Sequence, residues 1–360
     1  MTSIKFTRHV TIILVISFWL LIPGYNQEKS PTFNYQYFVS FIRENYGLFP
    51  YKNVDWDSLG RHYAQYVGEE TDPDSLFRVL SLLAENLKDK HIWLDNDRFA
   101  YNHSLGRVVP VNRMDSIFRT RESHKNLDLI RSKYLKNICD SSGINDCLYG
   151  MAGPGIGYLS ISRFDQDVRK VNSTMQHIMD HFRDCRALII DIRNNRGGTD
   201  SSALTMANFL VLSDTCYQIA RIRKNKDNED YSAPRIWSTS RKSRPFIGQV
   251  IVLINRYTIS AAESFSLALK TQPHIRFAGE HSAGALSDAE DGYLPNGWHF
   301  TYSTGAWTDC NGNIYEEKGI QPDIRPGGNP GECQNSDPWI DFSLNMLSMP
   351  LPPSSVREDP

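Results

Sequence analysis

The clearest indication of the fold is the segment Leu188-Ile189-Ile190-Asp191-Ile192-Arg193-Asn194-Asn195-Arg196-Gly197-Gly198. Its first half is an apolar run typical of a strand buried on both faces, and its second half is a polar turn that closes on two glycines. Buried polar side chains need hydrogen-bond partners, so the polar cluster that begins at Asp191 indicates a functional site at the end of the strand. Gly197 and Gly198 are candidate oxyanion donors, because glycine lets backbone N–H groups converge on a ligand. An ordinary strand-to-helix turn is the alternative.

Strand and helix patterns alternate on both sides of this segment. Short apolar runs predict strands, and apolar residues spaced three and four apart predict the helices between them. The expected strands are Ile156–Ile161, Ala187–Ile192 and Gln249–Ile254. The expected helices cover Val168–Phe182, a segment from Asp200 or Ser201 to about Leu212, and a segment from Ser260 to about Lys270. The alternation predicts an α/β core over residues 151–335, with sheets that are covered by helices.

A helical N-terminal domain is expected ahead of this core, over residues 28–97. Its clearest helix begins at Asp72-Pro73, because Asp is a good capping residue and Pro suits the first helical position. Leucines then recur on one face of that helix, at Leu76, Leu80, Leu83 and Leu87. Residues 98–150 are mixed and polar and are assigned as a connector. Residues 336–360 are assigned as a C-terminal tail that contains a short amphipathic piece.

The N-terminus has the layout of a secretory signal peptide, which we assign to residues 1–27. Lys5 and Arg8 precede an apolar run from Val10 to Ile22, and Pro23 ends it. These 13 residues would form a helix roughly 20 Å long, shorter than the ~30 Å thickness of a membrane core. Export to a periplasmic or extracellular compartment is therefore expected. An uncleaved N-terminal membrane anchor is the alternative.

Composition and cysteine spacing exclude several kinds of partner. The 39 Lys and Arg against 41 Asp and Glu give a net charge of -2, which lacks the basic signature of a nucleic-acid binder. Six cysteines without a CxxC pair fit an oxidising compartment and argue against a structural zinc site. They allow 15 pairings, of which Cys139–Cys147 and Cys310–Cys333 close the shortest loops. No metal or cofactor is expected.

Ser260 is the first candidate for chemistry, in the segment Thr258-Ile259-Ser260-Ala261-Ala262-Glu263 between a strand and a helix. At a helix start, unpaired N–H groups can stabilise a developing oxyanion, which makes the N–H of Ala261 a candidate donor beside the Ser260 hydroxyl. The alternative is a capping box, in which Ser260 and Glu263 only satisfy the first helical turn.

Two further segments supply candidates for a base and its partner. His91 follows the Leu-rich helix, and histidine is the usual base for a serine nucleophile. Glu316 precedes a Gly-x-x-Pro-Asp turn and is a candidate for the acid that orients such a histidine. Taken alone, His91 is also compatible with a role at a helix C-terminus, and Glu316 with a solvated surface hairpin.

Together, in this order, these segments resemble the carboxyl-terminal processing (tail-specific) serine protease family. The segments that match its motifs are Asp89-Lys90-His91, the stretch from Asp191 to Gly198, Ser260 to Glu263, Gly279 to Gly284, and Glu316 to Asp323. The resemblance covers about residues 33 to 330. It implies a layered ββα core similar to ClpP and crotonase-like proteins, preceded by a helical domain that delivers His91.

Two departures indicate the branch of the family that the chain resembles. Members with a Ser-Lys dyad have a lysine where this chain has Ala285, and only 63 residues separate His91 from Gly155, too few for the usual PDZ domain. A chain that lacks both the Ser-Lys dyad and the PDZ domain resembles the branch of the family that contains the tricorn protease core and the interphotoreceptor retinoid-binding protein repeats. In tricorn-like members a serine precedes the histidine, whereas this chain has Lys90.

The resemblance implies an exported serine peptidase that hydrolyses peptides or unfolded polypeptides. Ser260 would be the nucleophile, His91 the general base and acid, and Glu316 the residue that orients His91. The N–H groups of Ala261 and of Gly197 or Gly198 would form the oxyanion hole. The alternative is a non-catalytic binding module of the same fold that carries an apolar or peptide ligand.

Overall fold

The computed structural model describes residue 28 and residues 30–113, 126–140, 147–224 and 231–349. The predicted signal peptide and the last residues of the predicted tail lie outside these ranges. Within them, no helix is both long and apolar enough to cross a membrane.

A six-stranded sheet forms the centre of the core, in the order β11-β10-β7-β6-β5-β4. Its strands are β4 (Lys136–Asp140), β5 (Cys147–Gly153), β6 (Ile156–Ile161), β7 (Ala187–Asp191), β10 (Gln249–Ile254) and β11 (Ile275–Gly279). The strands β6, β7, β10 and β11 run parallel, whereas β4 and β5 pair antiparallel at one edge. The three strands expected from the apolar runs are confirmed, and the fold is α/β as predicted.

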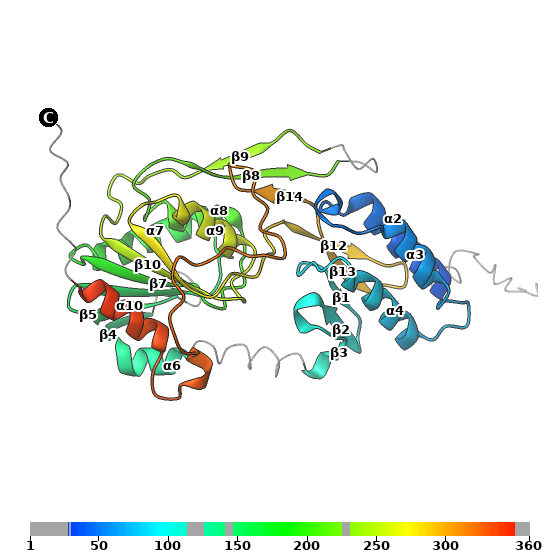
Figure 1. Cartoon of the computed structure of the whole chain (residues 1–360), viewed down its shortest axis with the longest axis horizontal. Coiled ribbons are helices and arrows are strands. Elements are labelled where there is room, and N and C mark those ends of the chain that lie inside the picture. Colours follow the sequence, from blue (N-terminus) through cyan, green and yellow to red (C-terminus); the bar gives the residue numbers. More distant parts are fainter. Residues whose placement is uncertain (1–27, 29, 114–125, 141–146, 225–230, 350–360) are drawn as a thin grey trace, which may run out of the picture.

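Helices cover both faces of this sheet (Figure 1). One face carries α7 (Val168–His181), α8 (Asp200–Ala207) and α9 (Ala261–Lys270), and the other carries α6 (Leu127–Leu129), the π-helical turn Ile130–Tyr134 and α10 (Pro338–Ser348). Strand β7 shows why its sequence is apolar throughout. Leu188 and Ile190 pack with the first set of helices and Ile189 with the second, and all three are fully buried.

The front region combines helices with a second sheet. The helices are α2 (Pro31–Asn45), α3 (Trp56–Ala64) and α4 (Pro73–Glu85). Asp72 caps α4 as predicted, by accepting hydrogen bonds from the N–H groups of Asp74 and Ser75. The leucines on its inner face are all buried: Leu76, Leu80, Leu83 and Leu87.

The second sheet combines strands from two distant parts of the chain, near residues 93–110 and 289–303, in the order β12-β13-β1-β2-β3. Its members are β1 (Trp93–Asp95), β2 (Phe99–Asn102), β3 (Val109–Pro110), β12 (Ala289–Tyr293) and β13 (His299–Ser303). The range 98–150, expected as a connector, therefore holds two strands of the front sheet and two of the core sheet. Strand β1 pairs with β13, so the chain immediately after His91 is joined to residues near 300.

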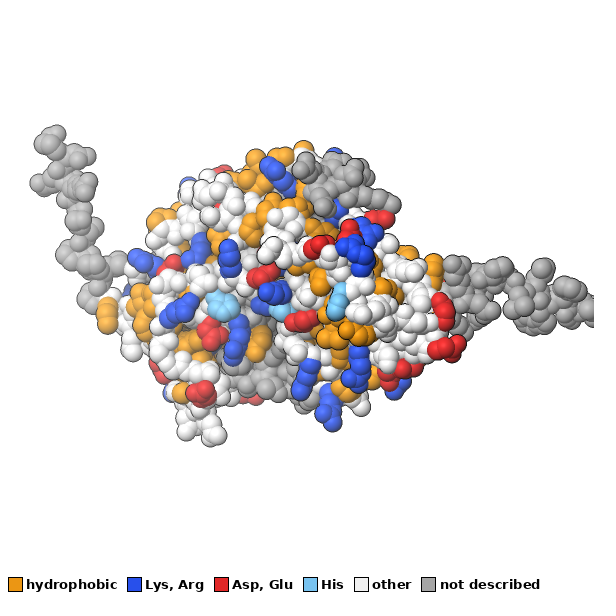
Figure 2. All heavy atoms as spheres, turned by 45° about the vertical axis from the view of Figure 1, so that its right-hand side comes forward, with side chains coloured by type: hydrophobic (Ala, Val, Ile, Leu, Met, Phe, Trp, Pro, Cys, Tyr) orange, Lys and Arg blue, Asp and Glu red, His pale blue; other side chains and the backbone are white. Residues whose placement is uncertain are grey.

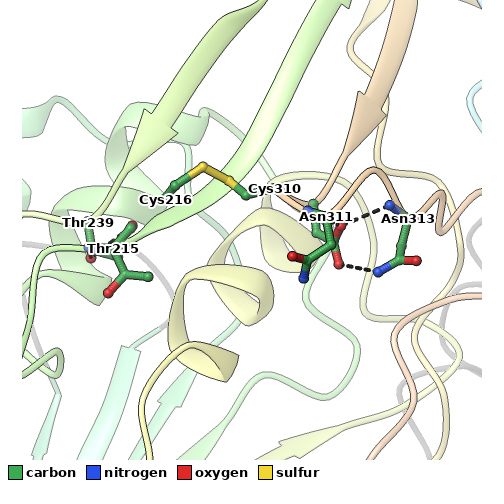
Figure 3. The surroundings of a disulfide bond; sticks show 7 residues. Thr215, Cys216, Thr239, Cys310, Asn311 and Asn313 are labelled. Carbon is green, nitrogen blue, oxygen red and sulfur yellow. Dashed lines mark hydrogen bonds between the residues drawn. A yellow bond between two sulfur atoms is a disulfide. The ribbon is translucent and has the colours of Figure 1, made fainter.

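A small third sheet, β14-β8-β9, links the two regions across the top of Figure 1. It consists of β8 (Cys216–Ile222), β9 (Arg235–Ser238) and β14 (Gly305–Thr308). A disulfide joins Cys216 to Cys310 over a separation of 94 residues, with Cα atoms 6.1 Å apart (Figure 3). The predicted pairing of Cys310 with Cys333 is therefore wrong, and Cys139 is not disulfide-bonded either. The length of the loop between two cysteines did not predict the disulfide. Cys216 and Cys310 are brought together because β14 pairs with β8 in the third sheet.

The first polar residues after β7 serve the core rather than a cleft. Arg193 is fully buried, and its Nη2 lies 2.6 Å from Asp191 Oδ2 and 2.8 Å from Asp337 Oδ2 at the start of α10. Tyr158 donates a further hydrogen bond to Asp191, at 2.7 Å. These ion pairs satisfy the charged half of the polar cluster that was predicted at the strand end.

Candidate active site

Ser260 stands at the sharp turn between β10 and α9. Its backbone has φ 61° and ψ −128°, in the half of conformational space that favours glycine. Such strain in a non-glycine residue persists only where surrounding contacts enforce it, and it is common at active sites. The turn places Ser260 at the N-terminus of α9, where helical N–H groups and the helix dipole favour negative charge.

The glycine turn after β7 lies directly against Ser260. A Cβ atom at Gly197 would approach the Cβ of Ser260 to 2.8 Å and the carbonyl oxygen of Ile259 to 2.8 Å, and Gly197 has φ +80°. Only glycine fits there. The N–H of Gly197 itself donates to Asn195 Oδ1 at 2.9 Å, whereas the N–H groups of Gly198 and Ala261 make no backbone hydrogen bond to the described residues.

Glu263 holds the start of α9 to the segment Ser282–Ser287, which we call the 282–287 loop. The carboxylate is fully buried and accepts hydrogen bonds from the N–H groups of Ser260, Gly284 and Ala285 at 3.3, 2.8 and 2.8 Å. The hydroxyl of Ser282 adds another at 2.5 Å. Glu263 thus caps the helix as the alternative interpretation expected, and it also ties the turn at Ser260 to this loop.

No lysine occupies the position expected of a Ser-Lys dyad. Ala285 is fully buried, and its carbonyl accepts the N–H of Ser260 at 3.1 Å. Lys270 lies at the far end of α9, where it pairs with Asp323 at 2.9 Å. Lys90 donates to the carbonyl of Ala283, so it contacts the 282–287 loop by its side-chain amine.

His91 is held in place through its backbone. Its N–H donates to Asp89 Oδ1 at 2.7 Å, and its carbonyl accepts a hydrogen bond of 2.5 Å from the hydroxyl of Thr301 on β13. In the ring, Nδ1 is buried without a hydrogen-bond partner among the described residues. Burial lowers the pKa of His91, and the nearby Asp89 carboxylate opposes this effect. A neutral imidazole at neutral pH is the form that a general base requires.

Glu316 is buried rather than solvated, with 5% of its surface exposed. Its Oε1 accepts hydrogen bonds from the N–H groups of Leu286 and Ser287 at 2.8 and 2.9 Å, and its Oε2 has no partner among the described residues. Burial, followed by the charge of Asp89, raises the pKa of Glu316 to about 8, against the weaker opposing effects of the Ser287 N–H and Lys52. The solvated surface hairpin that the sequence allowed for this residue is therefore wrong.

The 282–287 loop contacts Ser260, Glu316 and the residue next to His91. Ser260 donates to Ala285, Glu316 accepts from Leu286 and Ser287, and the residue before His91 contacts Ala283. The structure has no hydrogen bond between the Ser260 hydroxyl and the His91 ring, both of which it describes. Such bonds are often long in free enzymes and tighten when substrate binds.

A cavity of about 750 Å³ adjoins this site on the side of α3. The cavity is lined by Lys52, Lys88 and Glu317, among others. Lys88 lies just before His91 in the chain and has φ +48°. Within the lining, Lys52 Nζ lies 2.7 Å from Glu317 Oε1.

Acidic and basic side chains are interspersed over the face in Figure 2, with no patch of one sign. In the part of the chain that the structure describes, no three His, Cys, Asp or Glu side chains gather as metal ligands would.

Several residues of the site were assigned other roles, or none, from the sequence. Asp89 entered only as part of a motif, although a carboxylate two residues before a candidate base was a usable signal. Glu263 was assigned as a cap alone. Thr301 and Ser303 carried no signal, because they reach the His91 segment only through the pairing of β1 with β13.

Comparison with known proteins covers most of the described chain. Residues 155–325 match the family model of peptidase family S41, and residues 27–84 match the tricorn protease C1 domain. A candidate CtpA-like serine protease of Staphylococcus epidermidis is 27% identical over 175 residues, which are 47% of this chain and 33% of that protein. The carboxy-terminal processing protease CtpB of Bacillus subtilis is 28% identical over 173 residues, which are 48% and 34%. The match thus spans about a third of these relatives.

Solved structures share the fold over nearly the whole described chain. A candidate peptidase from Parabacteroides merdae has a TM-score of 0.73 at 22% identity, covering 89% of this chain and 97% of that one. Mature CPAF complexed with lactacystin has a TM-score of 0.64 at 12% identity, covering 89% and 98%. The tricorn protease has a TM-score of 0.51 at 14% identity, covering 89% of this chain and 36% of that one. The chain is thus similar to peptidase family S41 over residues 155–325, and it shares its fold with these solved structures.

Proposed function

We propose that the chain is an exported serine peptidase that hydrolyses peptide bonds in peptides or unfolded polypeptides. The observation that carries the proposal is the strained turn at Ser260, packed against Gly197 and followed by the N–H of Ala261. Acyl transfer requires a hydroxyl beside backbone N–H groups that are free to bind an oxyanion, and the N–H groups of Gly198 and Ala261 make no backbone hydrogen bond to the described residues. The match of residues 155–325 to peptidase family S41 supports the same reaction class.

In this proposal each group has one task. His91 takes the proton of the Ser260 hydroxyl as it attacks the peptide carbonyl, and later gives that proton to the leaving amine. The N–H groups of Gly198 and Ala261 stabilise the oxyanion, and Gly197 allows the turn to approach. Glu316 is the acid of the site that orients His91. A water molecule then hydrolyses the acyl-enzyme.

Export is the second part of the proposal. The basic residues ahead of the apolar run in residues 1–27 support it, and so does the Cys216–Cys310 disulfide, since disulfides persist in oxidising compartments. Detecting the mature protein outside the cytoplasm with this disulfide intact would agree with the proposal.

A fluorophosphonate probe tests the peptidase directly, because it reacts covalently with an activated serine. We expect the full chain to be labelled and to degrade an unfolded protein such as reduced casein. Ser260→Ala should abolish both, and His91→Ala should slow labelling by about 10³-fold or more. Ser266→Ala is the matched control, since its hydroxyl only bonds the Ala262 carbonyl within α9. A wild-type chain that is neither labelled nor able to degrade casein would point to the binding module instead.

A further inference from the structure

A disulfide fastens the hairpin that leads into Glu316. This hairpin comprises residues 308–315, and we call it the 308–315 hairpin. It continues from β14, and a β-bridge closes its base. Cys310 lies in its turn, where the disulfide joins it to Cys216, the first residue of β8 (Figure 3). Glu316 is the next residue after the hairpin. The cross-link and the acid of the site therefore share one short segment of chain.

The turn of the hairpin is hydrogen-bonded to itself. The carboxylate of Asp309 accepts the N–H groups of Asn311 and Asn313 at 2.9 Å each, and the side-chain amide of Asn313 at 2.7 Å. Both asparagines are exposed. Among the described residues, every hydrogen bond made by residues 309–314 has its partner within the 308–315 hairpin. The disulfide is therefore the bond that ties this turn to the core.

The other end of the disulfide is firmly attached. Thr215, next to Cys216, exchanges two hydrogen bonds of 2.9 Å with Thr239 (Figure 3). In one of them the N–H of Thr239 donates to the carbonyl of Thr215, and in the other the N–H of Thr215 donates to the hydroxyl of Thr239. Thr239 is buried, and so is Tyr217 on the other side of Cys216. The disulfide thus connects a fixed strand end to a turn that is otherwise bonded only to itself.

One side-chain contact links the turn to Glu316. The hydroxyl of Tyr315 donates to Asp309 Oδ2 at 3.0 Å, so the residue before Glu316 is bonded to the residue next to the disulfide. The ring of Tyr315 is half-buried and packs against the core. Beyond Glu316 the chain has a different support, because the N–H of Glu317 donates to the carbonyl of Gly284 at 2.9 Å. The hairpin therefore supports Glu316 from its N-terminal side.

We propose that Cys216 and Cys310 are positioning residues of the active site, and that their disulfide holds the 308–315 hairpin so that Glu316 keeps its place. The proposal rests on the proposed function, because Glu316 is the acid of that same site. Without the disulfide, the hairpin keeps its internal hydrogen bonds but loses its tie to β8. Glu316 is then supported from one side only, and the site is less well ordered.

The proposal makes activity depend on oxidation of the two thiols. The bond forms by exchange with the disulfide of a small molecule or another protein. Cys216 and Cys310 give up two electrons and two protons, and the partner's disulfide becomes two thiols. Disulfides persist in oxidising compartments and are reduced in the cytosol. The peptidase is therefore expected to be fully active only in chains that have left a reducing compartment.

The double variant Cys216→Ser, Cys310→Ser removes the tie and nearly keeps the side-chain volume. We expect its rate of fluorophosphonate labelling to fall by about tenfold or more, at a temperature where circular dichroism shows a folded chain. Cys333→Ser is the matched control, since it replaces a half-buried cysteine that forms no disulfide, and it should be labelled like wild type. Dithiothreitol should slow the labelling of wild type to the same extent, oxidised glutathione should restore it, and neither should affect the double variant.

A cross-link that only stabilises the fold would also slow labelling, so the comparison is repeated in Glu316→Gln. If the disulfide acts through Glu316, its removal should cost less than about twofold in a chain that already lacks the carboxylate. Tyr315→Phe makes the same comparison with the disulfide intact, because it removes only the hydroxyl that contacts Asp309. We expect it to slow labelling about threefold in wild type and not at all in Glu316→Gln. This variant decides the question should the double cysteine variant fail to fold.

Several results would overturn the positioning role. They are wild-type labelling of the folded double cysteine variant, wild-type labelling of Tyr315→Phe where the double variant does not fold, and equal fold-losses with and without the carboxylate of Glu316. Labelling of Glu316→Gln at the wild-type rate would remove Glu316 from the site and this proposal with it. In all these cases wild type is labelled, so the peptidase proposal stands. Wild-type protein that is not labelled would overturn both.

Discussion

The two halves of the candidate site are held by different kinds of contact. Ser260 is half-buried in the turn between β10 and α9, and its N–H is held by Glu263 and by the carbonyl of Ala285. The segment of His91 has no regular structure and is held by hydroxyl groups from β13, with Thr301 and Ser303 lying 210 and 214 residues further along the chain than the groups they contact. The proposed nucleophile is thus positioned by a turn between two elements that are adjacent in sequence, whereas the proposed base is positioned by contacts from a distant strand.

This difference implies that the two halves will respond differently to substitution. A change in the core should alter the stability of the whole chain, because core residues pack on both faces of one sheet. A change among the hydroxyl groups behind His91 should cost little stability and should act mainly on the rate of the reaction.

The largest effect is expected in the core, from Arg193→Met. The substitution removes the ion pairs that Arg193 makes with Asp191 and Asp337, both of which are buried. An uncompensated buried charge costs about 3–5 kcal/mol, so the midpoint of urea unfolding should fall sharply. Arg163→Met is the control, because its pair with Asp165 is half-exposed and should contribute less than about 1 kcal/mol. Equal losses in both variants would contradict the role of Arg193.

The next effect is a pH dependence of stability that originates in the base half. The pKa of Glu316 is about 8 in the folded chain against an ordinary value of 4.5. Between these values the folded state binds more protons than the unfolded state, so the contribution of Glu316 is full below pH 4.5 and is lost as the pH rises through 8.

Comparing Glu316→Gln with wild type isolates this contribution. The free energy of unfolding of wild type, relative to the variant, should fall by on the order of 2–4 kcal/mol between pH 5 and 8. Thermal or urea unfolding across that range measures it. Glu70→Gln, at an exposed position, should keep the wild-type slope. An unchanged slope in Glu316→Gln would show that Glu316 is ionised throughout.

The smallest effect on stability is expected from Thr301→Val, which keeps the shape of the side chain. It leaves the carbonyl of His91 and the N–H of Trp93 without the hydroxyl that each contacts, at a cost of about 1–2 kcal/mol. The rate of fluorophosphonate labelling should fall by more than this loss of stability explains, because the base is less well held. Thr205→Val, whose hydroxyl only contacts Ser201 within α8, should change neither. Unchanged labelling in Thr301→Val would remove β13 from the positioning of His91.

Local patterns predicted the core well. Strands β6 and β10 have the expected bounds, and α4 begins at the expected cap, because each depends on residues that are neighbours in sequence. The end of α8 was misplaced: the helix stops at Ala207 rather than near Leu212. Apolar residues continue beyond it, and their periodicity alone does not distinguish a helix from the buried turns that follow.

The front sheet could not be predicted in the same way. Strand β12 is mostly exposed and polar, so it lacks the alternation that marks a half-buried strand. Strand β1 pairs with the adjacent β2 on one side, but its other partner, β13, lies about 200 residues away, and nothing in the local sequence indicates that pairing. The disulfide was missed for the same reason, since loop length carries no information about which strands are adjacent.

Short runs of consecutive residues were enough to indicate which groups could do chemistry: a hydroxyl at a helix start, a pair of glycines after a buried strand, and a histidine that ends a helical region. Each of these signals is local. The burial of Glu316, the contact of Asp89 with the N–H of His91, and the contacts of Thr301 and Ser303 with the segment of His91 became visible only in the folded chain. The strength of a charge depends on its burial and on its neighbours in space, and chain folding sets both.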